Sequence, residues 1–434
     1  LAGSLRHHET LQGERHAGEC HMQVPLEEQI SEVLLKLQGY SVERIEEVEF
    51  KDRKQIHVSI SSLSPAQCPI CKTALPVYDT RTRYIFHASI LGRAVILLLK
   101  RRRVNCPRCG IRTEEQSIAD GKKRHSRHLE RCVLGYTEKL DNKSTAKLLG
   151  YSVSSVYRID KAGLSKLEEN LISNTPKMEH ISLDEVAYEK YHQYATVLTN
   201  QDDGKVVDIH PGKSKSSAVA LFNKYSDKLD WVETVAMDFS HSYIGATREC
   251  FAEHYIVFDK FHVSQYVNRC LEKVRREIQR KLPEELRYQI KKHVRWLILR
   301  RDCNMTQWHH DRLEQLKQDN ADLFEAYLIK EELLSIFDKD ISKEVARDLL
   351  INWCDMASKS AYCAFRTLAK SILNKLNILL NWFVKHITNA KAEAVNNVIK
   401  TLLKRAYGYK DFDYFRLKVL QRCGYLMDGL THSN

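Results

Sequence analysis

The segment HISLDEVAYEKYHQYATVLTNQDDGKVVDIH, residues 180–210, contains three short runs rich in β-branched and aromatic residues. These runs are His180–Tyr188, Tyr194–Thr199 and Lys205–His210. The stretches between them are polar or contain glycine, and such stretches favour turns. The sequence therefore predicts three consecutive β-strands.

Two helices and two more strands are predicted directly downstream. Ser216–Tyr225 and Tyr243–Ala252 have helical character, whereas Thr234–Asp238 (TVAMD) and Tyr255–Phe258 (YIVF) are short and apolar, as buried strands are. The order β-β-β-α-β-α-β is that of the ribonuclease H-like fold, in which helices flank a mixed sheet. We therefore predict a multidomain α/β protein with a catalytic domain of this fold.

Three carboxylates fall on elements of this predicted domain. Asp184 lies inside the first strand, Asp238 ends the fourth, and Glu393 lies on a late helix. Each alone would be taken for a surface acid. Together they predict a nuclease site with two Mg²⁺ (or Mn²⁺) ions, because such ions bind oxygen ligands and fill their remaining positions with water and phosphate. Glu185 and Asp259 are alternative ligands.

The late helix is predicted at Asn389–Ala406, with Gly408 closing its C-terminus. One of its faces is apolar. The opposite face carries an acid, an amide and two lysines, which suits a metal ligand beside bound phosphates. These residues are Glu393, Asn397, Lys400 and Lys404.

Asp259 and His262 follow the last predicted strand, in the sequence DKFH. His262 could orient Asp259 or contact the scissile phosphate. The alternative is a histidine that begins a helix and bonds only to the backbone.

The chain between Phe258 and about Asn381 is predicted to be helical, and we interpret it as an insertion. The first helix of this block has an apolar stripe made of Val263, Tyr266, Val267, Cys270, Leu271, Val274 and Ile278. Another face carries a basic ridge that we expect to contact DNA, above all through Arg276. The ridge consists of Arg269, Lys273, Arg276 and Arg280.

Two CPxC pairs precede the catalytic domain, and 34 residues separate them. Each pair can present two thiolates to one ion, and four thiolates form the closed tetrahedral site that is typical of structural Zn²⁺. The predicted ligands are Cys68, Cys71, Cys106 and Cys109. Arg83–Val104 between the pairs is expected to form two strands around Leu91–Arg93, as in a zinc ribbon. A redox CxxC is the alternative, although it would not need the second pair.

A helix-turn-helix is predicted after the basic linker Gly121–His128. Its helices are Leu129–Leu140, Ser144–Leu149 with Ser144 as the N-cap, and Val153–Asp160. An ordinary helical hairpin is the alternative. The linker and the last helix supply the residues expected to contact DNA, which are Lys122, Lys123, Arg124, Ser154, Ser155, Tyr157 and Arg158.

Near the N-terminus, Pro25–Tyr40 is predicted to be a helix and Val48–Ile60 a strand or hairpin. Residues 1–24 are expected to be a disordered or non-native leader, with a histidine-rich metal-binding tail as the alternative. The predicted domains are 25–118 (zinc ribbon), 119–175 (helix-turn-helix), 178–262 and 381–427 (the two parts of the catalytic domain), and 263–380 (helical insertion).

The net charge of +12 is concentrated in two places. Lys100–Arg131 carries eleven basic and four acidic residues, and Arg269–Arg301 carries twelve and four. Such clusters suit a polyanion, although a solvated basic surface is the alternative. The longest apolar run, Ala94–Leu99, is too short to span a membrane. Twelve cysteines could indicate disulfides, but four of them have metal-ligand spacing and the sequence has no secretory features, so we expect a reducing cytoplasm.

Taken together, these motifs resemble the ISL-three family of bacterial insertion-sequence transposases over about Cys68 to Tyr425. The resemblance rests on the paired CPxC motifs, the helix-turn-helix and five further stretches. These stretches are LDEVAYEKYHQYATVLT (183–199), AMDFSHSY (236–243), VFDKFH (257–262), VRRE (274–277) and NAKAEAVNNVIKTLLKRAYGYKDFDYF (389–415). One departure is Ala394, where the family has glycine.

The resemblance implies a DDE transposase that acts in the bacterial cytoplasm at the nucleoid. Its triad would be Asp184, Asp238 and Glu393, with Asp259 and His262 as the D-x-x-H element. The zinc ribbon and helix-turn-helix would recognise the terminal inverted repeats in double-stranded DNA, and a homodimer would bridge two ends before joining them to target DNA. A DNA-binding regulator, an inactive domesticated transposase and a nuclease without strand transfer are the alternatives.

Overall fold

The structure is a computed structural model that describes residues 35–50, 53–189, 193–258, 260–284, 287, 294–387 and 390–428. The chain divides into two compact units. Unit 1 runs to Tyr136 and includes Lys143–Val156, and unit 2 consists of Thr137–Asn142 and the chain from Tyr157 onward. The predicted leader and most of the predicted helix Pro25–Tyr40 lie outside the described residues. The last part of that prediction is wrong, because residues 35–39 form turns and loop, and a strand begins at Tyr40.

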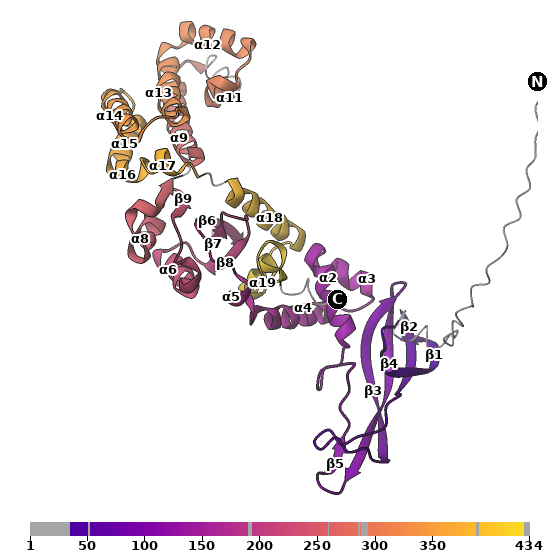
Figure 1. Cartoon of the computed structure of the whole chain (residues 1–434). Helices are drawn as coiled ribbons and strands as arrows, with labels where there is room; N and C mark the ends of the chain where they lie inside the picture. The colour runs from indigo at the N-terminus through magenta and orange to yellow at the C-terminus, as the bar shows by residue number, and fades with distance from the viewer. Residues whose placement is uncertain are drawn as a thin grey trace, which may run out of the picture. The chain divides into compact units, whose positions relative to one another are not determined.

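A five-stranded mixed sheet forms most of unit 1 (Figure 1). Its strands are β1 (Tyr40–Phe50), β2 (Arg53–Ser62), β3 (Val77–Ile90), β4 (Arg93–Cys106) and β5 (Gly110–Thr113). Their order is β1-β2-β4-β3, with β5 paired to β4. β1 and β2 form the predicted hairpin, and β2 runs parallel to β4.

The long hairpin of β3 and β4 turns at the predicted place. Leu91 and Gly92 have φ angles of 48° and 76°, the left-handed region that suits glycine best. The apolar run Ala94–Leu99 lies in β4 and is buried except at the half-buried Leu98, and its alternate residues Val95, Leu97 and Leu99 pack with Val58 and Ile85.

The helical segments after β5 are α2 (Arg127–Lys139), α3 (Asn142–Leu149), α4 (Val153–Glu168) and α5 (Leu171–Asn174). The turn before α4 has a positive φ at Gly150, where an added Cβ would lie 3.1 Å from the backbone at Gly92 and Ala94. The predicted N-cap at Ser144 is wrong, because α3 begins two residues earlier, at Asn142. Asp141 precedes the helix, and aspartate is favoured at the N-cap position.

A second five-stranded sheet lies in unit 2, in the order β10-β9-β6-β7-β8 (Figure 1). β6, β7 and β8 are antiparallel neighbours, whereas β9 and β10 run parallel to β6. The strands are β6 (His180–Glu189), β7 (Gln193–Asn200), β8 (Val206–Pro211), β9 (Thr234–Met237) and β10 (Ile256–Phe258). The connecting helices are α6 (Lys215–Lys224), α7 (Ser226–Leu229), α8 (His241–Cys250) and the short η2 (Glu253–Tyr255). The elements follow one another in the predicted order.

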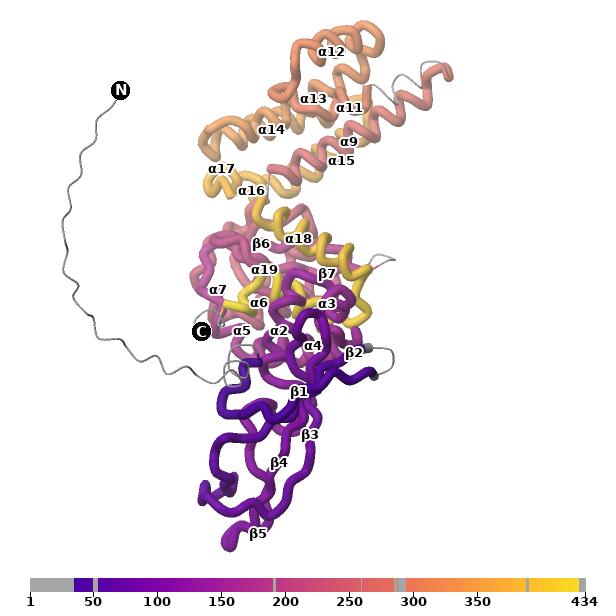
Figure 2. Tube along the Cα trace, turned by 90° about the vertical axis from the view of Figure 1, so that its right-hand side faces the viewer, coloured from indigo at the N-terminus to yellow at the C-terminus, as the bar shows by residue number. Residues whose placement is uncertain are grey.

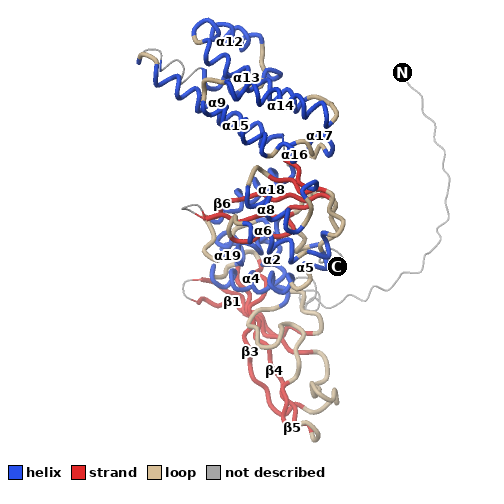
Figure 3. Tube along the Cα trace, turned by 90° about the vertical axis from the view of Figure 1, so that its left-hand side faces the viewer, coloured by secondary structure: helices blue, strands red, loops and turns tan. Residues whose placement is uncertain are grey.

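In its described residues, the block that follows β10 is all-helical, and Figure 3 shows helices and loops there. The block consists of α9 (Lys260–Lys281), α11 (Arg295–Leu299), η4 (Asp302–Asn304), α12 (Gln307–Asp319), α13 (Ala321–Asp338), α14 (Lys343–Lys359), α15 (Cys363–Asn374), α16 (Leu376–Leu379) and α17 (Trp382–Lys385). The predicted apolar stripe of α9 is buried except at Tyr266, which is 38% exposed. None of the helices in the described chain is long and apolar enough to cross a bilayer.

The chain then returns to the second sheet through α18 (Ala390–Ala406) and α19 (Phe412–Cys423). The views in Figures 1 and 2 place α18 beside β6, although more than 200 residues separate them, and a hydrogen bond of sequence separation 212 joins the two elements. Gly408, with φ 94°, donates its N–H to Leu403 O at 3.0 Å and closes α18 as predicted.

Candidate active site

Asp184 lies in the middle of β6 and is half-buried. Its Oδ1 accepts the backbone N–H of Glu185 at 2.7 Å, and its Oδ2 accepts the side-chain amide of Asn396 at 2.6 Å. Asn396 comes from α18, so the last predicted helix of the catalytic domain reaches the first predicted carboxylate.

Asp238 follows β9, the strand next to β6. The register pairs Ser182 with Ala236, so Asp184, two residues further along β6, lies near Asp238, which directly follows the end of β9. Asp238 Oδ1 accepts the backbone N–H of Ser240 at 2.9 Å, at the start of α8. Two of the three predicted triad members therefore lie near one another beside the C-terminal end of β9.

Burial raises the pKa of Asp184, and the nearby negative charge of Asp238 raises it further. The Glu185 N–H, the charge of His262 and the Asn396 amide act in the opposite direction. A cation between the carboxylates would favour their charged forms.

Glu185 occupies the same charged environment. Burial raises its pKa, Asp238 and Asp184 add to this effect, and Lys213 opposes it with a nitrogen 3.8 Å from the Glu185 carboxylate. Glu185 thus stays an alternative ligand.

His262 lies in the first turn of α9, half-buried and close enough for its charge to lower the pKa of Asp184. The fold thus brings it to the carboxylates. Asp259 lies outside the described residues, so its predicted role has no structural counterpart here.

Glu393 lies in the first turn of α18 and its side chain is exposed. Within the described parts of the chain, the four paired cysteines form the sole group of three or more potential ligands whose atoms all lie within 4.8 Å of one another. The structure therefore brings Asp184 and Asp238 together but does not draw the Glu393 carboxylate into a compact cluster with them.

Asn396, one helical turn beyond Glu393, is a site residue that the sequence analysis missed. It is 7% exposed, and its Oδ1 is buried without a hydrogen-bond partner while its amide nitrogen binds Asp184. An unpartnered amide oxygen beside two carboxylates fits a hard cation, which prefers such oxygen ligands. The pair Asn396–Asn397 was the available signal, and the sequence analysis chose the exposed Asn397 instead.

Lys375 is a second residue that the sequence analysis missed. It follows α15, and its Nζ donates to Phe239 O at 3.2 Å, next to Asp238. Burial lowers the pKa of Lys375, while the charge of Asp238 opposes the shift. No local pattern marks this lysine, because it reaches the site from the helical insertion.

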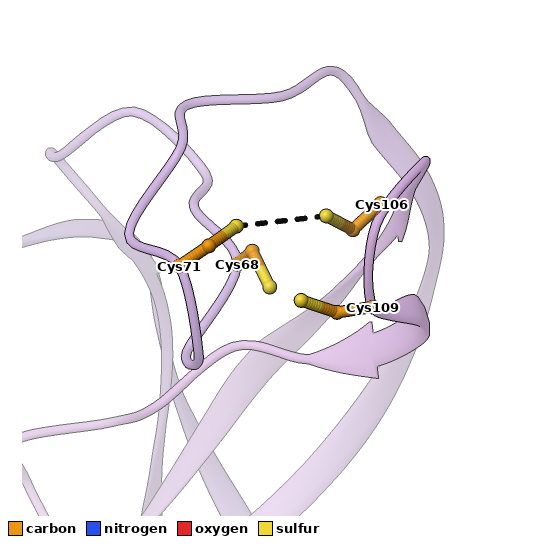
Figure 4. A group of neighbouring side chains, drawn as sticks. All are labelled: Cys68, Cys71, Cys106 and Cys109. Atoms are coloured by element: carbon orange, nitrogen blue, oxygen red, sulfur yellow. Dashed lines mark hydrogen bonds between the residues drawn. The ribbon is translucent and has the colours of Figure 1, made fainter.

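The second predicted metal site is built as expected in unit 1. Figure 4 shows Cys68 and Cys71 opposite Cys106 and Cys109, and the four sulfur atoms lie within 4.8 Å of one another. The first pair comes from a turn and the second from the end of β4 and its turn into β5.

The turns that hold the thiols have a specific backbone. In the first, Lys72 has φ 59° and donates its N–H to Cys68 O at 2.9 Å. A hydrogen bond with Thr73 lowers the pKa of Cys71 to about 6, whereas burial raises that of Cys109 to about 12. All four thiols can become thiolates together only when a cation balances their charge.

The predicted DNA-contacting residues lie in different surroundings. Lys122, Arg124, Ser154 and Arg158 are exposed, as are Lys400 and Lys404 on α18. Several of the predicted residues bond to neighbours: Lys123 pairs with Glu130 at 2.9 Å, Ser154 and Ser155 with Ser152 at 3.1 and 2.8 Å, and Arg276 with Glu272 at 3.0 Å. Tyr157 is half-buried and its hydroxyl donates to Asp411 at 2.7 Å.

Comparisons with known proteins match both parts of the chain that hold these candidate sites. A family model described as a transposase, of the ISL3 (ISL-three) group, matches residues 181–419. A second model, described as the zinc finger of transposases IS204/IS1001/IS1096/IS1165, matches residues 64–109. With the four-cysteine cluster, this match supports a structural zinc in unit 1.

Two relatives carry transposase names. The transposase for insertion sequence element IS1001 of Bordetella parapertussis is 28% identical over 91% of this chain and 98% of its own length. The transposase for IS1557 of Mycobacterium tuberculosis is 22% identical over 56% of this chain and 59% of its own length. The Drosophila P element transposase strand transfer complex aligns with a TM-score of 0.34 and 8% identity, over 72% of this chain and 95% of that one, which is too little similarity to carry an argument.

The transposase model covers more than half of the chain, and it includes Asp184, Asp238, His262, Glu393 and the helical block between them. On this evidence, the chain belongs to the ISL3 family of transposases.

Proposed function

We propose that this transposase cuts and joins DNA through a DDE triad of Asp184, Asp238 and Glu393 on a ribonuclease H-like domain. The strand order β10-β9-β6-β7-β8, with three antiparallel strands and two parallel additions, supports this fold. The observation that carries the proposal is the proximity of Asp184 and Asp238, the first of which is bonded to a side chain of α18.

The proposed site would hold two Mg²⁺ (or Mn²⁺) ions, which activate the attacking oxygen and stabilise the leaving one when bound. Asp184 and Asp238 would supply ligands from the sheet, and Asn396 could add its unpartnered Oδ1. Glu393 would join from α18, since residues three apart on a helix lie on neighbouring positions of one face.

Positive side chains around the carboxylates would hold the DNA. Lys375 lies beside Asp238, and the exposed Lys400 and Lys404 follow Glu393 along α18. These cations would bind the phosphates on either side of the scissile bond. His262, close to Asp184, would orient the scissile phosphate or Asp259.

The substrate we propose is double-stranded DNA with the terminal inverted repeats of an insertion sequence. The zinc ribbon and the helix-turn-helix would bind the ends, and water would cut each end to free a 3′-hydroxyl. That hydroxyl would attack target DNA without a covalent enzyme intermediate. A homodimer in the bacterial cytoplasm, at the nucleoid, would hold both ends.

The test is end cleavage by the full chain with Mg²⁺ and labelled terminal repeats taken from the DNA that flanks the gene. Glu393→Gln should abolish cleavage and leave repeat binding intact, whereas Glu189→Gln, an exposed acid at the end of β6, should cleave normally. Undiminished cleavage by Glu393→Gln would refute the triad. Binding without cleavage by the unaltered protein would instead indicate a regulator or an inactive transposase.

A further inference from the structure

A basic groove of about 900 Å³ lies on unit 1, across β3, β4, β5 and the loop that follows them. No acidic side chain of the described chain lines this groove. Its basic residues are Arg81, Arg83, Arg101, Arg103, Lys122 and Arg124.

The arginines continue the core face of the sheet. On β3 and β4, Ile85 stands opposite Leu97, and both are buried in the core. Side chains two residues apart share one face of a strand. Arg83 and Arg81 therefore continue the face of Ile85, and Arg101 that of Leu97. The face of the β3–β4 hairpin that is apolar and buried at Ile85 and Leu97 therefore carries guanidinium groups further along, at Arg81, Arg83 and Arg101.

This arrangement is unfavourable for the protein alone. Arg81 stands directly opposite Arg101, and like charges in that position destabilise a sheet. Arg101 Nε is buried and has no hydrogen-bond partner, which costs free energy for any buried donor. Burial also lowers the pKa of Arg83, and the charge of Arg101 adds to this effect. An anion in the groove would supply the missing acceptor and screen the repulsion.

The loop beside β3 extends the basic surface. Arg83 donates to Gly121 O at 3.0 Å and to Lys123 O at 2.5 Å, and so fixes the loop on the strand. Lys123 is held in ion pairs, whereas Lys122 and Arg124 on either side are exposed at the groove. Arg83 thus holds the loop against β3, and Lys122 and Arg124 of that loop present positive charge to the groove.

We propose that this groove binds the sugar–phosphate backbone of DNA independently of base sequence. Guanidinium groups match phosphate oxygens two at a time, which a row of lysines would not. Asp79 neutralises Arg103 at 2.9 Å, so the binding charge comes from Arg81, Arg101, Lys122 and Arg124. The inference rests on the proposed function, since it takes the partner to be the DNA that the transposase acts on.

The test compares Arg81→Gln/Arg101→Gln with a control of equal charge change, Arg44→Gln/Lys100→Gln. The control residues are exposed and pair with Glu46 and Glu43 outside the groove. Full-length, zinc-loaded protein is titrated by fluorescence anisotropy against two labelled duplexes, one with the terminal repeat and one scrambled. At 0.1 M salt the groove variant should bind both duplexes at least about tenfold more weakly than the unaltered protein. The plot of log K against log salt concentration should also become shallower by about 1.8, which is about 0.9 for each of two lost phosphate contacts.

Three results would overturn the inference: affinity and slope unchanged in the groove variant, a loss no greater than in the control, or a loss confined to the terminal repeat. If the groove variant does not retain zinc or its near-ultraviolet spectrum, Lys122→Gln/Arg124→Gln, altered only at exposed loop positions, is held to the same three criteria. Failure of the proposed function would be seen in the unaltered protein instead, which would then bind neither duplex or would bind DNA without cutting it.

Discussion

The contact between Asn396 and Asp184 ties the candidate chemistry to a single side chain. Its amide donates to one carboxylate oxygen, and its own oxygen is buried and unpartnered. The sequence could predict that one face of α18 meets the site. It could not predict that Asn396 rather than Asn397 does so, because that depends on the rotation of the helix against a strand more than 200 residues away.

Replacing Asn396 with leucine should lower the cleavage rate by roughly 10- to 100-fold, as loss of a supporting contact at a metal site does. It should also change the pH profile. The amide lowers the pKa of Asp184, so its loss raises that pKa, and the acid limb of the rate profile moves to higher pH. Cleavage rates measured across pH with Asn397→Leu as the control test this. A lower rate with an unmoved acid limb would contradict a positioning role.

His87 gives unit 1 a pH dependence of stability. The ring is buried between Ser126 Oγ at 2.8 Å and Leu35 O at 2.7 Å, and burial lowers its pKa from 6.5 to about 4. Between pH 6.5 and about pH 4, His87 is protonated in the unfolded chain but stays neutral in the folded chain. The free energy of unfolding should therefore fall by about 3 kcal/mol from pH 6.5 to pH 4.

Urea unfolding at several pH values measures the free energy of unfolding of the unaltered protein and of His87→Gln. The difference between these two free energies isolates the contribution of His87. A difference that stays constant across the window would contradict it.

Among the elements, those with strong local patterns were predictable. Alternating or helically spaced apolar residues correctly predicted three features: the β1–β2 and β3–β4 hairpins, the strands of the second sheet, and the buried stripe of α9. The N-cap of α3 was misplaced because Asp141, which precedes the helix, is as good a capping residue type as Ser144. The position of Lys375 beside Asp238 depends on the fold of the insertion, which no local pattern encodes.

The zinc ribbon allows a prediction for one element. Chelation, or Cys106→Ser, should remove one equivalent of Zn²⁺ and lower the melting temperature of unit 1, because a closed thiolate site contributes its binding free energy to folding. Calorimetry with a zinc assay measures both. Cys303→Ser, which changes an exposed cysteine elsewhere, serves as the control. If chelation leaves the melting temperature unchanged, the four cysteines hold no structural metal.

At the scale of the whole molecule, the chain combines a zinc-bearing unit with a second unit that interrupts its α/β domain by a helical block. The insertion separates Glu393 from Asp184 and Asp238 in sequence, and the fold returns α18 to β6. The sequence predicted this return through the ribonuclease H-like order of elements and the family resemblance, since a propensity pattern carries no information about which distant elements meet.

The account depends on Asp184 being a metal ligand, and a change of metal preference tests this most directly. Asp184→Cys replaces a hard oxygen ligand with a softer sulfur, which Mg²⁺ tolerates poorly and Mn²⁺ tolerates better. End cleavage of labelled terminal repeats by this variant should be lost in Mg²⁺ and recover in Mn²⁺, while Asp184→Ala stays inactive in both. Cleavage by Asp184→Cys that is normal in Mg²⁺, or equally absent in both metals, would contradict the account.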